Sequence, residues 1–223
     1  MKEKIKLYVA TPVHSDVSIH YMQSIIRLQA ECYKRNVEFT LDMMKSSLVT
    51  QGRNTCVAHF LNTDYTHLLF VDSDILFYPQ SIFKMLDKNV EMCSIPYPMK
   101  LINWDKVFDK TGVITSMNQL QRNTSGNKFP VKIKDEEHDV TMTDEMIELN
   151  YAPTGCMLLQ RQVFDKMLQE PLYKKLLLTA KLQLHHICII FLILFMMKKI
   201  KGIMERILLF LNYGVKQEAS VMR

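Results

Sequence analysis

Two aspartates follow an apolar run in the first third of the chain. Asp72 and Asp74 come directly after residues 68–71, with the small Ser73 between them. Strand residues alternate faces, but beyond the end of a strand the chain can turn and direct both carboxylates at one point. Adjacent carboxylates repel each other unless a cation lies between them, and Mg²⁺ or Mn²⁺ suits such oxygen ligands and also binds phosphate. The pattern therefore favours a metal-diphosphate site, and its alternative is a solvated Asp-Ser-Asp turn.

Strands and helices alternate along the first 95 residues. Alternating and apolar runs predict strands at residues 4–10, 37–41, 66–71 and 91–95, and helical spacing predicts helices at residues 17–35, 53–61 and 79–86. Ser15 or Asp16 can cap the first helix, Asn36 can end it, and a polar loop at residues 45–52 leads into the second. This alternation implies a parallel sheet with right-handed crossovers.

Ligands of such sheets bind at the carboxyl ends of the strands. Thr11, the loop before Arg53 and the two aspartates all lie at such ends or just past them.

After residue 98 the alternation of strands and helices stops. Strands are predicted at residues 112–121 and 128–134, followed by a charged loop at residues 135–139. A loop and strand over residues 151–160 and a helix over residues 162–168 complete a single predicted domain.

Composition bounds the classes of protein that fit. With 223 residues, 48% hydrophobic and 23% charged, the chain suits one globular domain. Its five cysteines include no CxxC pair, which argues against a zinc ribbon or a disulfide scaffold and fits a reducing compartment. No signal peptide precedes the first strand, so we expect a cytoplasmic protein.

The last fifth of the chain differs from the rest. Residues 180–223 hold seven Lys/Arg and two Asp/Glu, whereas residues 1–179 hold 21 of each sign. A neutral body without a basic stripe disfavours nucleic acid as a partner. The apolar run at residues 187–197 is shorter than the roughly 20 residues of a membrane-spanning helix, so we expect no such helix. A buried helix or a surface anchor stays open as an interpretation.

We favour a different origin for this tail, namely translation in a shifted reading frame. Codons can be chosen for residues 191–223 so that another frame encodes a charge-balanced sequence with an ordinary helical pattern. We therefore expect a domain at residues 1–179, and at residues 180–223 a poorly ordered or helical tail that is not a separate domain.

Four elements of the chain, in this order, resemble the GT-A class of glycosyltransferases. They are Thr11-Pro12, the helix start at residues 52–54, residues 70–74, and residues 153–157 before a strand. The sequence looks most like the small nucleotide-sugar transferases of large DNA viruses, phages and bacteria, over residues 4–168. The resemblance implies an α/β fold, a Rossmann-like GT-A sandwich with a mainly parallel central sheet flanked by helices. It also implies transfer of a sugar from a nucleotide-diphosphate sugar, with UDP expected, to an acceptor hydroxyl.

The resemblance assigns roles to the matching residues. Those placed against the donor are Thr11, Pro12, His14, Arg53, Asp72, Ser73 and Asp74, and those placed at the sugar or acceptor pocket are Thr154 and Gly155. Asp72 and Asp74 would hold Mn²⁺ or Mg²⁺ on the diphosphate. Asp74 would bind the metal directly, and Asp72 would face the ribose or a water bound to the metal.

Several of these residues also have a plainer interpretation. Arg53 could be a surface helix arginine, His14 a structural or solvated histidine, and Gly155 a turn glycine. Trp104 could stack on a sugar ring or pack in the core. The acceptor, whether glycan, protein or lipid, stays open.

One departure from the family concerns the catalytic base. Many members carry a later acidic residue, on a helix after the acceptor loop, as the base or an acceptor-binding group. No acidic residue after Glu170 occurs in that context, so the base stays unassigned. A degenerate, non-catalytic nucleotide-sugar-binding protein is therefore a rival hypothesis. A haloacid-dehalogenase-like phosphatase is a second, although its Asp-x-Asp normally ends the first strand of the domain rather than the third.

Overall fold

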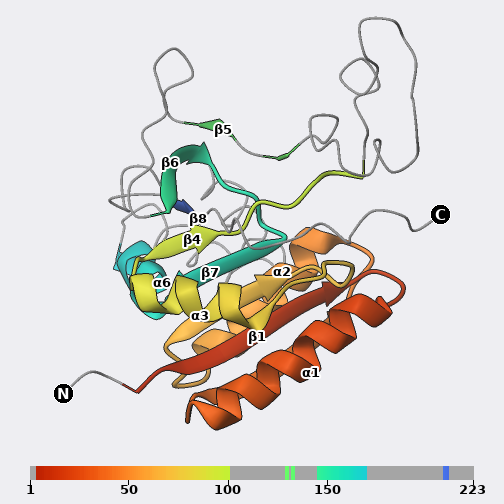
Figure 1. Ribbon diagram of the computed structural model, residues 1–223, viewed down its shortest axis with the longest axis horizontal. Coiled ribbons are helices and arrows are strands. Elements are labelled where there is room, and N and C mark those ends of the chain that lie inside the picture. Colours follow the sequence, from red (N-terminus) through yellow and green to blue (C-terminus); the bar gives the residue numbers. More distant parts are fainter. Residues whose placement is uncertain (1–3, 101–128, 131, 134–144, 170–207, 211–223) are drawn as a thin grey trace, which may run out of the picture.

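The computed structural model describes residues 4–100, 129–130, 132–133, 145–169 and 208–210 of the chain (Figure 1). Trp104, the strand predicted at residues 112–121, the charged loop at residues 135–139 and most of residues 180–223 lie outside these ranges. Within the described residues, no helix combines the length and apolar character that crossing a membrane requires.

Within these described ranges, eight strands form one mixed sheet in the order β2-β1-β3-β7-β4-β8-β6-β5. They are β1 (Lys6–Val13), β2 (Glu38–Lys45), β3 (His67–Val71), β4 (Met92–Ser94), β5 (Lys132–Ile133), β6 (Met146–Tyr151), β7 (Cys156–Gln160) and β8 (Leu208–Phe210). β1 pairs in parallel with β2 and β3, whereas β7 runs antiparallel to both of its neighbours, β3 and β4. The first five strands in the order of the sheet run from β2 to β4, and all of them except β7 therefore point the same way. This confirms the mainly parallel central sheet.

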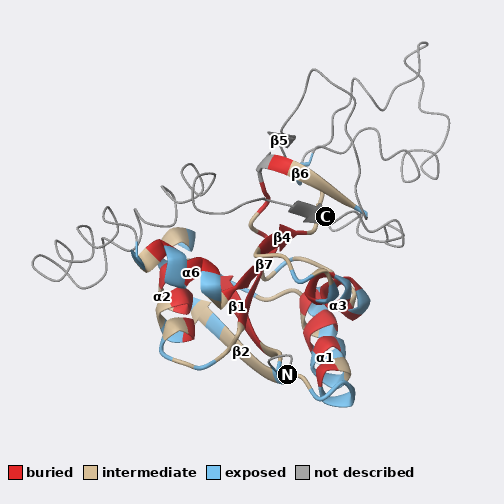
Figure 2. Ribbon diagram, turned by 90° about the vertical axis from the view of Figure 1, so that its left-hand side faces the viewer, coloured by how far each residue is buried: buried red, intermediate tan, exposed pale blue. Residues whose placement is uncertain are grey.

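Helices cover both faces of this sheet, as Figure 2 shows. In the described part of the chain the helices are α1 (Ile19–Lys34), α2 (Val49–Leu61), α3 (Pro79–Lys88) and α6 (Arg161–Gln169). One core cluster joins the sheet to α1 and α3, and the other joins the opposite face to α2 and α6. The result is the Rossmann-like sandwich that the sequence predicts.

The alternation of β1 explains why both faces are covered. Leu7 and Val9 pack in the cluster of Ile25 from α1, whereas Tyr8 and Ala10 pack in the cluster on the other face. Successive strand residues point to opposite faces, so the unbroken apolar run at residues 7–10 must be covered on both faces of the sheet. Burying a side chain such as Leu7, which is fully inaccessible, stabilises the fold by about 1.5–3 kcal/mol.

Two predicted helix boundaries were wrong, namely the start of the first helix and the start of the second. Ser18, rather than Ser15 or Asp16, caps α1: its hydroxyl accepts a hydrogen bond from the Tyr21 N–H at 3.1 Å. At the other end Asn36 has a φ of 55°, consistent with the predicted stop.

The second helix begins at Val49, so half of the loop predicted at residues 45–52 is helical. Glycine disfavours a helix interior, yet Gly52 lies inside α2 because the helix packs closely on its neighbours. A Cβ at Gly52 would approach the Cβ atoms of Ser46 and Pro12 to 3.2 and 3.3 Å. Tertiary packing therefore overrides local propensity at this position.

The second half of the chain adds strands that were not predicted. β6 was missed, and Leu208–Phe210, within the tail expected to be poorly ordered or helical, forms β8 between β4 and β6. Such pairings join residues that are distant in sequence, and a short apolar run does not specify its partner strand.

Candidate functional site

Asp72 lies one residue beyond β3, and its backbone is fixed to Gly155, the residue before β7. Its N–H donates a hydrogen bond to the Gly155 carbonyl at 2.8 Å, and its own carbonyl accepts one from the Ile75 N–H at 3.1 Å. The second bond closes a turn over residues 72–75. These backbone hydrogen bonds therefore hold the side chain of Asp72 at the carboxyl end of β3.

Arg53 joins this strand end to two other segments. Its Nη2 donates to Asp72 Oδ1 at 2.6 Å, and its Nη1 donates to Thr154 Oγ1. The guanidinium also lies 5.7 Å from the centre of the Phe70 ring. The Arg53 side chain is only 13% exposed, so the alternative of a surface helix arginine is wrong. A guanidinium that is held by two hydrogen-bond acceptors is a preorganised, positively charged group.

Gly155 occupies a position where no side chain fits. A Cβ there would lie 2.6 Å from Cζ and 2.7 Å from the hydroxyl of Tyr97, and 2.8 Å from Cδ1 of Ile75. The Gly155 N–H donates to the Tyr97 hydroxyl at 3.1 Å. This close approach explains the glycine better than a turn conformation does.

Tyr97 is a site residue that sequence analysis missed. Burial and, to a smaller degree, the charge of Asp72 raise the pKa of its phenol. The phenol therefore stays protonated at neutral pH, and its O–H is a donor beside Asp72. The only sequence signal was an aromatic residue between Pro96 and Pro98, just past β4.

Ser73 ties the turn after β3 to the loop after β1. Its hydroxyl donates to the Asp16 carbonyl at 3.1 Å, and its carbonyl accepts a hydrogen bond from the Ser18 N–H at 2.9 Å. These bonds hold the carboxyl ends of β1 and β3 together, as adjacent parallel strands require. The structure thus brings Ser73 into the assembly through its backbone and hydroxyl.

Asp74 faces a second cation. Lys100 Nζ lies 2.5 Å from Asp74 Oδ2, and this carboxylate raises the pKa of the lysine through a hydrogen bond and through its charge. The side chains of Lys100 and Asp74 are 85% and 47% exposed, so this ion pair is weak and screened by solvent. Each aspartate of the motif therefore has a basic partner of its own, Arg53 for one and Lys100 for the other.

The remaining predicted donor residues lie near this assembly in different ways. Thr11 is fully buried and its hydroxyl is hydrogen-bonded to that of Tyr21, whereas Pro12 is buried beside Gly52. His14 is exposed. Hydrogen bonds directly join four of the predicted residues, Arg53, Asp72, Thr154 and Gly155. The other three, Thr11, Pro12 and His14, lie only at the carboxyl end of β1.

Asp72 and Asp74 carry the kind of oxygen ligand that a divalent cation prefers. Among the described residues, one oxygen of each carboxylate makes an ion pair and no contact occupies the other, and both side chains reach solvent. No cluster of three or more His, Cys, Asp or Glu occurs in this part of the chain. Mg²⁺ and Mn²⁺ are commonly held by one or two carboxylates, with water and phosphate oxygens as further ligands, so two carboxylates suffice.

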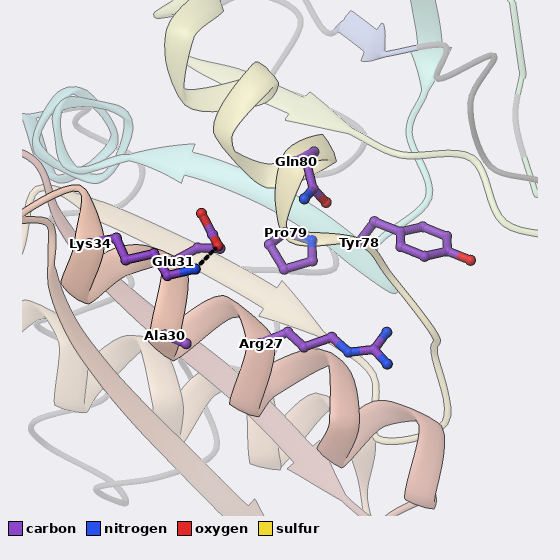
Figure 3. A pocket seen from close by; sticks show the side chains of 7 residues that line it. All are labelled: Arg27, Ala30, Glu31, Lys34, Tyr78, Pro79 and Gln80. Atoms are coloured by element: carbon purple, nitrogen blue, oxygen red, sulfur yellow. Dashed lines mark hydrogen bonds and ion pairs between the residues drawn. The ribbon is translucent and has the colours of Figure 1, made fainter.

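A hollow of about 280 Å³ lies elsewhere, between α1 and the start of α3 (Figure 3). It is lined by Arg27, Ala30, Glu31, Lys34, Tyr78, Pro79 and Gln80. Glu31 and Lys34, one turn apart on α1, pair with each other at 2.8 Å, and none of the predicted site residues lines the hollow. We therefore place the candidate site at the carboxyl ends of β1 and β3, where charged groups from several segments converge.

Comparisons with known proteins give no family. No family model matches the chain, and no curated protein matches its sequence. Among solved structures, the protein A197 from STIV is 17% identical with a TM-score of 0.42, covering 73% of this chain and 68% of that one.

Two further solved structures are more distant in sequence. A glycosyltransferase involved in glycosylation of the PBCV-1 major capsid is 8% identical with a TM-score of 0.37, covering 78% of this chain and 66% of that one. A 4-diphosphocytidyl-2C-methyl-D-erythritol synthase from Anaerococcus prevotii is 7% identical with a TM-score of 0.34, covering 76% and 79%. With TM-scores below 0.5, these similarities do not establish an activity.

Proposed function

We propose that the chain is a metal-dependent glycosyltransferase that moves a sugar from a nucleotide-diphosphate sugar to an acceptor hydroxyl. The observation that carries the proposal is the convergence of Arg53, Asp72 and Thr154 at the carboxyl end of β3. These residues come from three separate segments. In open α/β sheets this edge is the usual place for a ligand.

The charges of the site suit a diphosphate held through a cation. Asp72 and Asp74 would hold Mn²⁺ or Mg²⁺, because their carboxylates keep a free oxygen among the described residues and reach solvent. When bound, the metal ion supplies Lewis-acid stabilisation of the charge that develops on the leaving diphosphate. UDP is the nucleotide that we propose.

The chain's own residues would bind and orient the donor. Arg53 is already fixed by Asp72 and Thr154, so it presents positive charge at the strand end without having to be ordered first. Lys100 can leave the exposed carboxylate of Asp74 and pair with a phosphate oxygen. Tyr97 keeps its proton at neutral pH and can donate it in a hydrogen bond to a sugar or phosphate oxygen.

Transfer also needs a base that accepts the proton of the acceptor hydroxyl. We assign the role of this base to none of the described residues around Asp72. A non-catalytic nucleotide-sugar-binding protein is therefore the second candidate, since it would need the donor residues alone. The phosphatase is a weaker candidate, because the Asp-x-Asp of that class normally ends the first strand of the domain, whereas Asp72 follows the third strand, β3.

Two assays on the full chain separate these functions. Calorimetric titration with UDP and GDP, with and without Mn²⁺, measures metal-dependent binding. A coupled assay then measures release of the nucleoside diphosphate from the sugar nucleotide, with and without candidate acceptors. We expect metal-dependent binding and release. Binding without release favours the non-catalytic protein, and hydrolysis of a generic phosphomonoester with no diphosphate binding favours the phosphatase.

A further inference from the structure

The outer edge of β2 has no partner strand among the described residues. β2 ends the strand order of the sheet, and its register with β1 is unbroken over all eight of its residues. Proteins normally protect such an edge with proline, a bulge or outward charges, because its backbone N–H and C=O groups are unpaired. β2 contains no proline, and its central charge, Asp42, is hydrogen-bonded to Tyr8 and His59 on the α2 face. The edge is therefore suited to pairing with another strand.

α1, which lies beside this edge, exposes three large apolar side chains. Ile19, Ile26 and Tyr33 are 71%, 60% and 88% exposed. They are seven residues apart, so they lie in one line along the helix. Single exposed apolar residues are ordinary, but an apolar line next to an open strand edge indicates a contact surface.

This line of residues lies on the β2 side of α1. From the core-facing Ile25, about 100° of rotation in one direction reaches Ile26, and about 120° in the other direction reaches Glu31. Glu31 lines the hollow between α1 and α3, so α3 occupies that side of α1 (Figure 3). In Figure 2, β2 lies at the lower edge of the sheet, with α1 next to this edge and α3 farther up.

We infer that β2 and the exposed line on α1 form the interface of a symmetric dimer, in which the partner is a second copy of this chain. The two β2 strands pair antiparallel about a twofold axis and join the two sheets into one. A twofold interface requires a patch that is complementary to itself. The inference does not depend on the proposed function.

The residues of β2 favour one register for this pairing. Phe39 and Leu41 pack against the core cluster on the α1 face, and Met43 points to the same face by alternation. An axis at Leu41 places Leu41 opposite its own copy and Phe39 opposite Met43, so the three apolar side chains meet one another. Moving the axis by one residue pairs Glu38 with Asp42, or Asp42 with its own copy. Like charges in opposite positions are destabilising, so neither alternative competes.

The same symmetry brings the two copies of α1 to packing distance. Ile25 of α1 shares a cluster with Leu7 of β1, and Phe39 and Leu41 of β2 pack against that cluster, so α1 covers both strands. Neighbouring strands are about 4.8 Å apart, so a helix above β1 and β2 lies two strand spacings, about 10 Å, from its copy. Packed helices are about 8–10 Å apart. The second copy of α1 therefore covers the exposed apolar line of the first.

The first test measures the oligomeric state of the full chain. Sedimentation equilibrium at micromolar concentration should give twice the chain mass of 26.2 kDa. Ile26→Glu and Met43→Lys place a charge among the apolar contacts, so the dissociation constant of the dimer should rise at least tenfold. The controls should remain dimers. They are Arg27→Glu, on the α3 side of α1, and Met99→Lys, at a methionine 41% exposed against 47% for Met43.

The second test examines the register by disulfide formation. Leu41→Cys places two thiols opposite each other at the axis, with Cβ atoms about 4.5–5.5 Å apart, close to disulfide distance. Lys45→Cys places its two thiols eight residues of register apart, about 26 Å. Mild oxidation should therefore link Leu41→Cys into a covalent dimer and leave Lys45→Cys unlinked. The wild type, whose described cysteines are all buried, shows the background of the native thiols.

Three outcomes would overturn the inference. They are a wild type that stays monomeric from low to high micromolar concentration, a dimer that both charged variants leave intact, and equal linking of the two cysteine variants. If circular dichroism shows that a charged variant is unfolded, the two cysteine variants decide alone. Neither test involves a nucleotide, so a failure here leaves the proposed function standing.

Discussion

The guanidinium of Arg53 and the carboxylate of Asp72 lie 2.6 Å apart at the carboxyl end of β3. The same guanidinium donates to Thr154, which lies 101 residues away in sequence. One side chain thus joins the helix after β2, the end of β3 and the loop before β7. Its removal should disturb both the stability and the binding properties of the site.

Arg53→Ala should lower the free energy of unfolding by about 1–3 kcal/mol, because it leaves Asp72 and Thr154 without their partner in a partly buried position. It should also weaken nucleotide binding. Urea denaturation measures the first effect and calorimetry the second. Arg27→Ala, which removes an exposed arginine of α1, is the matched control and should change neither. Equal behaviour of the two variants would contradict the assigned role.

Lys100→Gln should raise the affinity for Mn²⁺ about two- to fivefold. The ammonium group competes with the metal for Asp74, and an exposed ion pair of this kind contributes little to affinity or stability. The control is Lys45→Gln, which changes the net charge equally at an exposed position at the end of β2. A titration with Mn²⁺ alone decides the outcome, and a weaker affinity in Lys100→Gln would mean that the lysine does not compete.

Gly155→Ala should destabilise the protein by about 1–3 kcal/mol, since its Cβ would lie 2.6 Å from the Tyr97 ring. The variant Tyr97→Ala removes the ring but leaves Ile75, so the double variant should recover part of the loss. A double-mutant cycle from urea denaturation measures this coupling. Additive effects of the two substitutions would show that they do not meet.

Stability should depend on pH through His67. Burial lowers the pKa of His67 to about 4, below its unperturbed value of 6.5. Between these pH values the unfolded chain binds the proton and the folded chain does not, so stability falls as the pH falls from about 6.5 to 4. The loss amounts to about 3 kcal/mol.

The comparison with His67→Leu isolates this contribution from that of the carboxylates. Free energies of unfolding measured from pH 7 to pH 4 should fall more steeply for the wild type than for the variant. Parallel pH profiles would mean that His67 is protonated in the folded protein.

The strand-end residues could be predicted because their signals are local. The apolar run before Asp72 and the polar residues after it predict the end of β3, and the alternation of strands and helices predicts where such ends gather. Arg53 was assigned through the resemblance to the GT-A class and through the loop before it, which was expected at a strand end. The structure brings these residues together with Thr154 and Gly155 as the sequence suggested.

The partners that complete the site could not be predicted in this way. Tyr97 and Lys100 follow β4, and their contacts with Gly155 and Asp74 depend on β7 lying between β3 and β4 in antiparallel register. That register is a long-range pairing, which no local pattern specifies. The start of α2 was misplaced for a related reason, because close packing of Gly52 on Pro12 outweighs its poor helix propensity.

The central claim is that Asp72 and Asp74 hold a divalent cation that in turn holds a nucleoside diphosphate. Calorimetric titration of UDP into the wild type, Asp72→Asn and Asp74→Asn, each with Mn²⁺ and with chelator, tests it most directly. We predict binding by the wild type that needs Mn²⁺ and falls at least tenfold in either variant, since each loses one carboxylate ligand. Wild-type binding that is equally tight in chelator, or unchanged in both variants, would contradict the claim.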